Sequence, residues 1–242
     1  MTEANEIRRL ALEVAKGAGK LLLSTAAGKT TSKSSPTDLV TEADRAAEEY
    51  IVGRIRTERP QDSVIAEEGF LHDGTSGITW VIDPLDGTIN FVYGIPQWCV
   101  SIGIEGAIRT GVIYDPMRDE TFTDQSGLKP SKHRELTGAL IGTGFSYSAE
   151  MRKRQAEVLR RVVPVVRDVR RAGSCALDLA WVAAGRLDGF YEDDTHHWDV
   201  SAGIALIESA GGHTKRHDRL TIAAGTRELL EELERLVLEE KS

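Results

Sequence analysis

Residues 80–88 read WVIDPLDGT, and this stretch sets the expected fold around a functional site. An apolar run that ends in Asp83 is typical of a buried strand. Pro84 has no backbone donor, so we expect the strand to end there and the chain to turn. Asp86 would then fold back toward Asp83, and the Gly-Thr pair at 87–88 would begin a helix whose N–H groups suit a phosphate. Two carboxylates beside such a turn fit a hard cation such as Mg²⁺, although capping alone is the commoner explanation of an isolated Asp-x-x-Asp.

Three further segments place acids at the ends of expected strands or helices, and these acids are Glu67 with Glu68, Asp199, and Asp44. Asp199 lies at a helix start, where N-capping is an adequate structural explanation. Thr41 followed by Asp44 is a capping-box pattern, in which Asp is a second choice to Glu. Each segment alone is weak evidence for a site, because a structural role explains it.

Working outward, apolar residues at helical spacing predict helices over residues 4–27, 41–58, 149–163, 174–184, 198–210 and 226–241. Short apolar runs predict strands over residues 63–67, 79–83, 99–105, 110–114, 139–142, 189–192 and 221–224. Helices and strands interleave along the chain, so we expect helical layers to alternate with sheets.

The chain of 242 residues carries a formal net charge of −8. This acidic balance disfavours a general nucleic-acid binder, which needs clustered Lys and Arg, and at first it also disfavours a phosphate substrate. Two separate cysteines, Cys99 and Cys175, cannot make a disulfide framework. The N-terminal segment lacks a signal-peptide core, and no stretch approaches a membrane span. We therefore expect a cytoplasmic protein without a membrane partner.

In order along the chain, these segments resemble the signatures of the inositol monophosphatase family. The run DPLDGTINF at 83–91 is the most specific match, and the acidic pair at 67–68 and the segment WDVSAG at 198–203 agree with it. Residues 33–41, KSSPTDLVT, resemble the family's mobile loop, and residues 173–176, GSCA, resemble a substrate-side loop. The resemblance covers nearly the whole chain. It implies an α+β fold, a layered α-β-α-β-α sandwich of the sugar-phosphatase type shared with fructose-1,6-bisphosphatase.

The resemblance implies one catalytic domain over residues 1–242. Two subdomains are possible within it, a metal- and phosphate-binding half over residues 1–125 and a substrate-side half over residues 126–242. It implies a phosphoric monoester hydrolase with two to three Mg²⁺ ions per active site. The residues implied for a first ion are Glu67, Asp83 and the Leu85 carbonyl. Those implied for a second are Asp83, Asp86 and Asp199, and Glu67 would share a weaker third ion with the mobile loop.

The resemblance also assigns roles toward substrate and water. The residues implied in catalysis are Asp44, Glu67 and Thr88, of which Asp44 and Thr88 would orient and deprotonate the attacking water. The residues implied in substrate binding are Asp86, Gly87, Thr88, Ser174, Cys175, Glu192 and Asp199. Bound Mg²⁺ would invert the local sign of this acidic site, so the net charge of −8 then indicates a required cation.

The substrate implied is a small phosphorylated polyol or sugar, with inositol 1-phosphate first. Alternatives with the same signature are a fructose-1,6-bisphosphatase or an enzyme with both activities, a histidinol-phosphatase, and a 3′(2′),5′-bisphosphate nucleotidase. Two non-enzyme readings remain, an interaction or regulatory protein that retains the fold and a metal-binding structural protein. No nucleic-acid partner is expected, and lithium sensitivity and a homodimer are family expectations.

The chain departs from the family pattern in two shortened segments, residues 121–140 and 212–221. Both lie in the second half and leave the implied metal ligands intact. We expect them to widen the substrate mouth or to alter a subunit contact.

Overall fold

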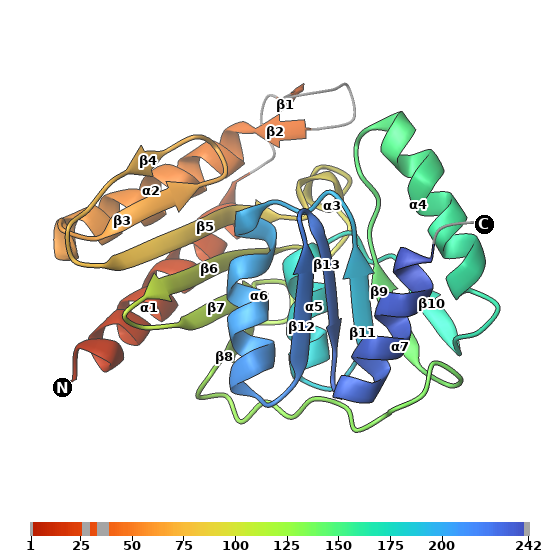
Figure 1. Cartoon of the computed structure of the whole chain (residues 1–242). Coiled ribbons are helices and arrows are strands. Elements are labelled where there is room, and N and C mark those ends of the chain that lie inside the picture. Colours follow the sequence, from red (N-terminus) through yellow and green to blue (C-terminus); the bar gives the residue numbers. More distant parts are fainter. Residues whose placement is uncertain (1, 26–29, 33–38, 240–242) are drawn as a thin grey trace.

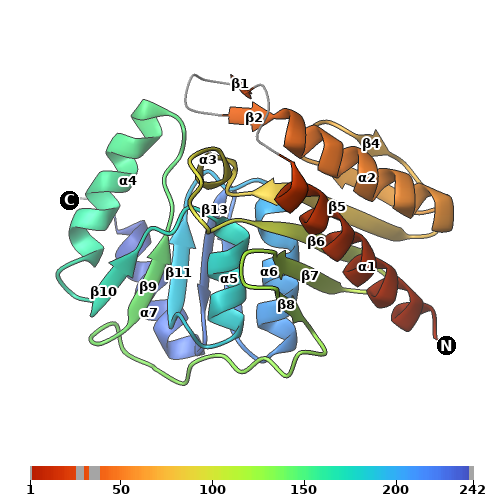
Figure 2. The ribbon, with the colours of Figure 1, turned by 180° about the vertical axis from the view of Figure 1, so that it is seen from behind.

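The computed structural model describes residues 2–25, 30–32 and 39–239, so residues 33–38 of the expected mobile loop lie outside the described residues. Helices and sheets alternate in five layers, as the sequence predicts (Figures 1 and 2). The outer helices α1 (Glu3–Ser24) and α2 (Glu42–Glu58) cover the first sheet, and α4 (Ala149–Val162) and α7 (Arg227–Leu238) cover the second. Between the sheets lie α5 (Cys175–Ala183) and α6 (His197–Ser209). The expected α-β-α-β-α sandwich is confirmed, and no helix in the described ranges is both long and apolar enough to cross a membrane.

The first sheet has the strand order β4-β3-β5-β6-β7-β8. Its strands are β3 (Ser63–Ala66), β4 (Leu71–His72), β5 (Ile78–Asp86), β6 (Cys99–Gly106), β7 (Thr110–Asp115) and β8 (Glu120–Thr123). The second sheet has the order β10-β9-β11-β13-β12, built from β9 (Leu140–Thr143), β10 (Asp168–Arg170), β11 (Gly189–Glu192), β12 (His213–His217) and β13 (Leu220–Ala224). A separate pair is formed by β1 (Thr30–Ser32) and β2 (Leu39–Thr41), and the short helix α3 (Thr88–Val92) follows β5.

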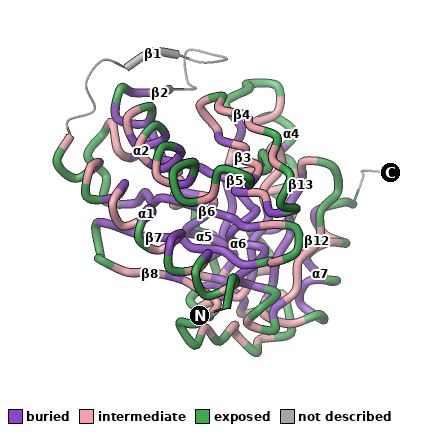
Figure 3. Tube along the Cα trace, turned by 90° about the vertical axis from the view of Figure 1, so that its left-hand side faces the viewer, coloured by how far each residue is buried: buried purple, intermediate pink, exposed green. Residues whose placement is uncertain are grey.

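Buried residues concentrate in the interior of the molecule (Figure 3), and their apolar side chains form one cluster in each gap between layers. Trp80 on β5 packs with residues of α1 and α2, and Phe190 on β11 packs with residues of α5 and α6. Leu233 on α7 belongs to a third cluster on the outer face of the second sheet. The middle helices α5 and α6 contact a sheet on each side. This explains why apolar residues occupy nearly every face of both helices.

The expected end of the strand at Pro84 is wrong, because β5 continues through Pro84 to Asp86. Asp83 pairs with Ser101 and Asp86 pairs with Cys99, so two residues of β5 stand opposite one residue of β6. This is a β-bulge, one of the places where a sheet tolerates a proline. The bulge shifts the register by one residue at the end of β5, where both aspartates lie.

Four strands of the two sheets escaped the sequence analysis, and they are β4, β8, β10 and β12. All four are the outermost strands of their sheets. Edge strands are short and carry polar side chains, as in HTKRH of β12, so they lack the apolar alternation that marks a buried strand.

Helix α6 approaches the first sheet closely because the facing positions are glycines. A Cβ atom on Gly103 of β6 would lie 2.1 Å from Ser201 Oγ, and one on Gly111 of β7 would lie 2.6 Å from the Ala202 carbonyl oxygen. The close approach brings the first turn of α6 beside the end of β5.

Asn90 ties α3 to the loop before α5. Its side-chain amide is buried and donates to the carbonyl oxygens of Gln97 at 2.7 Å and Ala172 at 2.9 Å. One side chain therefore fixes residues 171–174 against the segment that follows β5.

Gly111→Ala should lower the free energy of unfolding by about 1–3 kcal/mol, because the new methyl group overlaps the backbone of α6. Gly53→Ala in α2 is the matched control, since a Cβ there meets nothing within 4 Å. It should stabilise the protein by up to about 1 kcal/mol through helix propensity. Thermal unfolding measures both, and an unchanged Gly111→Ala protein would contradict the close packing.

Asn90→Ala should cost about 1–3 kcal/mol, because two buried carbonyl oxygens lose their donor. For a chain of this size the melting temperature should fall by roughly 2–4 °C per kcal/mol. Asn5→Ala, at an exposed position of α1, is the control and should change stability by no more than about 0.5 kcal/mol. Equal melting temperatures for both variants would show that the Asn90 amide does not hold the two segments together.

Candidate active site

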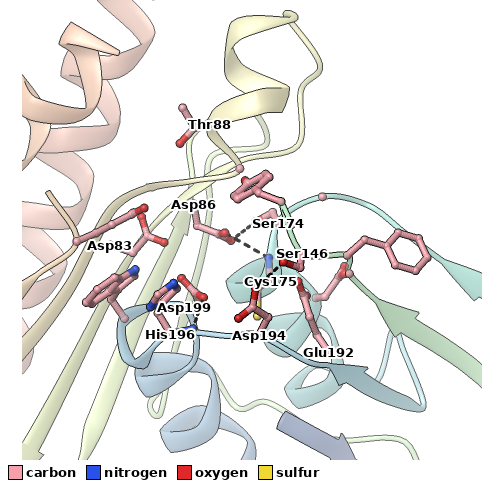
Figure 4. A pocket seen from close by; sticks show the side chains of 18 of the residues that line it. Asp83, Asp86, Thr88, Ser146, Ser174, Cys175, Glu192, Asp194, His196 and Asp199 are labelled. Atoms are coloured by element: carbon pink, nitrogen blue, oxygen red, sulfur yellow. Dashed lines mark hydrogen bonds between the residues drawn. The ribbon is translucent and has the colours of Figure 1, made fainter. Parts of the chain in front are cut away.

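A pocket of about 440 Å³ lies where the end of β5, the start of α3 and the first turns of α5 and α6 meet (Figure 4). All but one of the residues to which the resemblance assigns a role in catalysis, metal binding or substrate binding line it, namely Glu67, Asp83, Leu85, Asp86, Gly87, Thr88, Ser174, Cys175, Glu192 and Asp199. The exception is Asp44, which lies behind Thr88. The fold thus gathers positions that span more than 130 residues of sequence into one cavity.

The carboxyl group of Asp83 is the most constrained of the acids. It is 2 % exposed, and its Oδ1 accepts a hydrogen bond from the Leu85 N–H at 3.0 Å. Burial raises the pKa of Asp83 well above its usual range, and the charges of Glu67, Asp86 and Asp199 raise it further. Like charges in a pocket favour the protonated acid or a bound cation.

Asp86 is held by the first turn of α5. Its carboxylate accepts from the Ala176 N–H at 2.8 Å, from the Cys175 N–H at 3.3 Å and from the Ser174 hydroxyl. Burial raises the pKa of Asp86 to about 6, while the bonds from Ser174 and Ala176 act in the opposite direction. A helix N-terminus is a favourable place for a carboxylate, so α5 partly compensates the crowding of acids.

Asp199 does not occupy the expected N-cap. Helix α6 begins at His197 with His196 as the N-cap, and Asp199 is the third residue of the helix. Its Oδ2 accepts from the His196 N–H at 2.6 Å. Helix α6 starts earlier than the apolar pattern indicates, so the N-cap position falls on His196 instead of Asp199. Asp199 still faces the pocket (Figure 4).

Asp44 and Thr88 form a buried pair at the edge of the pocket. The Thr88 hydroxyl lies 3.0 Å from Asp44 Oδ1 and 3.1 Å from the Leu85 carbonyl oxygen, and both are acceptors. Asp44 Oδ2 accepts from the Thr41 N–H at 2.8 Å and from the Thr41 hydroxyl. The expected capping box is therefore confirmed, and the same carboxylate also reaches the pocket through Thr88.

The donor set suits a hard divalent cation in its chemistry. Carboxylates and the Leu85 carbonyl supply oxygen only, which Mg²⁺ prefers. Within residues 2–25, 30–32 and 39–239, no three His, Cys, Asp or Glu side chains are gathered as a ready-made metal site. The carboxylates of Asp83, Asp86 and Asp199 are turned apart, because each accepts a hydrogen bond from a different donor. The donors are the Leu85 N–H, the Ser174 hydroxyl and the His196 N–H, in that order. A carboxylate has roughly four lone-pair sites, so these bonds leave acceptor capacity for a cation.

The two cysteines are not suited to nucleophilic chemistry. Burial raises the pKa of both thiols well above the usual value, and nearby carboxylates add to the rise. A protonated thiol is a poor nucleophile, so Cys175 contributes shape and its backbone N–H to the pocket.

Sequence reasoning missed several other residues that line the pocket, including Ser146, Arg171, Asp178, Asp194 and Arg219. The Arg219 guanidinium forms an ion pair with Asp194 at 3.0 Å, and its Nη2 lies 2.8 Å from His196 Nε2. The His196 ring stacks on Trp198 with 4.8 Å between ring centroids. A histidine pair in a loop, such as His196 with His197, is more often structural, so the sequence alone favours a structural role for His196. The others carry no local signal, because only the tertiary fold brings them to the cavity.

Comparison with known proteins agrees with this geometry. The family model described as "Inositol monophosphatase family" matches residues 3–237. "Inositol-1-monophosphatase SuhB" from Mycobacterium tuberculosis is 43% identical over 204 residues, which cover 76% of this chain and 70% of the relative. "Nus factor SuhB" from Escherichia coli K12 is 40% identical over 219 residues, which cover 84% of this chain and 82% of that protein.

Solved structures show the same fold. The extragenic suppressor protein SuhB from Bartonella henselae superposes with a TM-score of 0.90 at 34% identity, over 98% of this chain and 100% of that one. An IMPase from Thermotoga maritima superposes with a TM-score of 0.85 at 28% identity, over 96% of each chain. The family match over nearly all of the sequence and the shared fold together show that this chain belongs to the inositol monophosphatase family.

Proposed function

We propose that this protein hydrolyses the phosphate monoester of a small polyol with the help of Mg²⁺, and that inositol 1-phosphate is its leading substrate. The observation that carries the proposal is the pocket itself, in which Glu67, Asp83, Asp86 and Asp199 stand beside the Gly-Thr pair at 87–88. Family membership supports a phosphatase with a phosphorylated small-molecule substrate and a divalent metal. The name of the M. tuberculosis relative supports the choice of inositol phosphate.

The proposed metal sites are assigned from the carboxylates that line the pocket. Glu67, Asp83 and the Leu85 carbonyl are assigned to one Mg²⁺, and Asp83, Asp86 and Asp199 to a second. Glu67 is also assigned to a weaker third ion. The raised pKa of Asp83 supports this assignment, because a cation would relieve the repulsion that keeps the acid protonated. Bound Mg²⁺ would neutralise phosphate charge and stabilise the developing charge of the leaving oxygen.

The chain's own residues then orient water and substrate. The Thr88 oxygen is placed to accept a proton from the attacking water while its hydroxyl proton moves to Asp44 Oδ1, 3.0 Å away. The Thr41 N–H and hydroxyl hold Asp44 for this task. Gly87 and Thr88 are assigned to the phosphate, and Ser174, Cys175 and Glu192 to the leaving polyol. Because in-line displacement depends on positioning, this fixed geometry supports catalysis.

The domain and assembly predictions also remain proposals. Both halves of the chain line the pocket, from Glu67 in the first to Glu192 in the second, which supports one catalytic domain over residues 1–242. A homodimer and lithium inhibition rest on the family resemblance.

A second candidate function is an interaction role without catalysis. The E. coli relative that is 40% identical carries the name Nus factor, which favours a regulatory partner for some members of the family.

A phosphate-release assay with and without Mg²⁺ separates the phosphatase function from the interaction role. The substrates are inositol 1-phosphate, fructose 1,6-bisphosphate, histidinol phosphate and 3′-phosphoadenosine 5′-phosphate. No release from any of the four would favour the interaction role.

Asp83→Asn should lower kcat for inositol 1-phosphate by about 10³-fold or more, because this carboxylate is assigned to both ions. Circular dichroism should show a folded protein. Asp73→Asn, the same change at an exposed position, is the control and should keep full activity. Near-normal turnover by Asp83→Asn would overturn the metal assignment.

Mg²⁺ should raise the melting temperature of the wild-type protein. At about 100 times its Kd, a ligand that binds only the folded state adds about 2.7 kcal/mol. For a chain of this size that corresponds to roughly 5–10 °C. Asp83→Asn should lose most of the increase, and without Mg²⁺ it should be at least as stable as the wild type because one buried acid is gone. Equal increases in both proteins would place the Mg²⁺ elsewhere.

A further inference from the structure

Asp178 is a buried carboxyl group in the pocket wall to which the roles described above give no task. It lies in the first turn of α5, it is 1 % exposed, and it lines the cavity. Its Oδ1 has no hydrogen-bond partner among the residues that the structure describes. A buried polar atom without a partner lowers the stability of the folded protein, so its retention at the pocket needs a reason.

Asp178 and Glu192 stand side by side along the end of β9. A Cβ atom on Gly142 would lie 3.6 Å from Asp178 Cβ, and one on Gly144 would lie 2.1 Å from the Glu192 carboxyl group. Residues two apart in an extended chain point to the same side and are separated by roughly 6–7 Å. Gly144 therefore leaves room for the Glu192 carboxyl group, and the Asp178 side chain starts beside Gly142 on the same wall of the pocket.

Burial, helped by a neighbouring charge, favours the protonated form of Asp178 more than in an ordinary aspartate. Burial raises the pKa of Asp178 well above its usual range, the charge of Asp86 adds to the rise, and Arg171 opposes it. Burial likewise raises the pKa of Glu192, with Asp199 and Asp178 contributing. A neutral carboxyl group donates one hydrogen bond and accepts others, which matches the capacity of an alcohol.

We infer that Asp178 is a substrate-binding residue that holds a hydroxyl group of the leaving alcohol next to the hydroxyl held by Glu192. The pair selects phosphate esters of polyols with neighbouring hydroxyl groups over esters of alcohols that have none. The inference rests on the proposed phosphatase function and adds a residue and a substrate feature to it. A site built around paired polar groups discriminates strongly against ligands that leave those groups unsatisfied.

The test compares two substrates, inositol 1-phosphate and phenyl phosphate, whose leaving group has no further hydroxyl. Asp178→Ala should raise KM for inositol 1-phosphate about tenfold with kcat within about threefold of wild type, because one hydrogen bond to the bound polyol is lost. The kcat/KM for phenyl phosphate should stay within about twofold. Asp178→Asn should recover most of the affinity, since an amide also donates and accepts.

Comparison of the two substrates within each variant keeps the test valid if folding suffers. The ratio of their kcat/KM values does not depend on the amount of folded enzyme. Inhibition of phenyl phosphate hydrolysis by free inositol gives a second readout, with a Ki about tenfold higher in Asp178→Ala. Thr110→Val is the matched control, because Thr110 also buries an unpartnered oxygen but does not line the pocket.

Equal losses on both substrates would overturn the inference and leave Asp178 a structural residue. Unchanged kinetics in Asp178→Ala would overturn it as well. If Arg171→Ala and Asp178→Ala changed the kinetics of the two substrates in the same way, Asp178 would act only as a counter-charge to that arginine. This result would also overturn the inference. A wild-type protein that releases no phosphate from either substrate with Mg²⁺ would instead defeat the proposed function, on which the inference depends.

Discussion

Four acids, Glu67, Asp83, Asp86 and Asp199, share one buried pocket, and the surrounding structure is arranged around the repulsion between them. Three of them accept hydrogen bonds from different elements. The end of β5 itself supplies the Leu85 N–H to Asp83, the start of α5 supplies three donors to Asp86, and the start of α6 supplies the His196 N–H to Asp199. These local bonds let acids lie near one another in the folded chain, and they leave a negative site suited to a hard cation.

The meeting of these elements depends on two features that join the halves of the molecule. Glycines on β6 and β7 let α6 pack directly on the first sheet. Asn90 binds the loop before α5 to the segment after β5. The pocket therefore lies where the layers meet, and it combines Glu67, Asp83 and Asp86 from the first half of the chain with Glu192 and Asp199 from the second.

The sequence predicted most buried strands and helices, because their side chains repeat with the period of the element. It missed β4, β8, β10 and β12, which lie at sheet edges and are defined by backbone pairing rather than by an apolar pattern. It also ended β5 at Pro84, since a proline looks like a stop until the partner strand shows that a bulge accommodates it. The residues of the pocket that follow a signature were found in advance. Asp178, Asp194 and Arg219 were not, because nothing in their local sequence distinguishes them from surface or helix residues.

The sequence by itself determined the family, the order of the main helices and of the inner strands, and the set of acids with which a metal could be bound. Those properties depend on residue type, spacing and periodicity, which can be read from the sequence without the structure. The tertiary structure alone decided which acids are buried together, how far their pKa values rise, and which carboxyl group lacks a partner in the pocket wall. These properties depend on desolvation and on distances between residues far apart in sequence, and such distances exist only after the layers have packed.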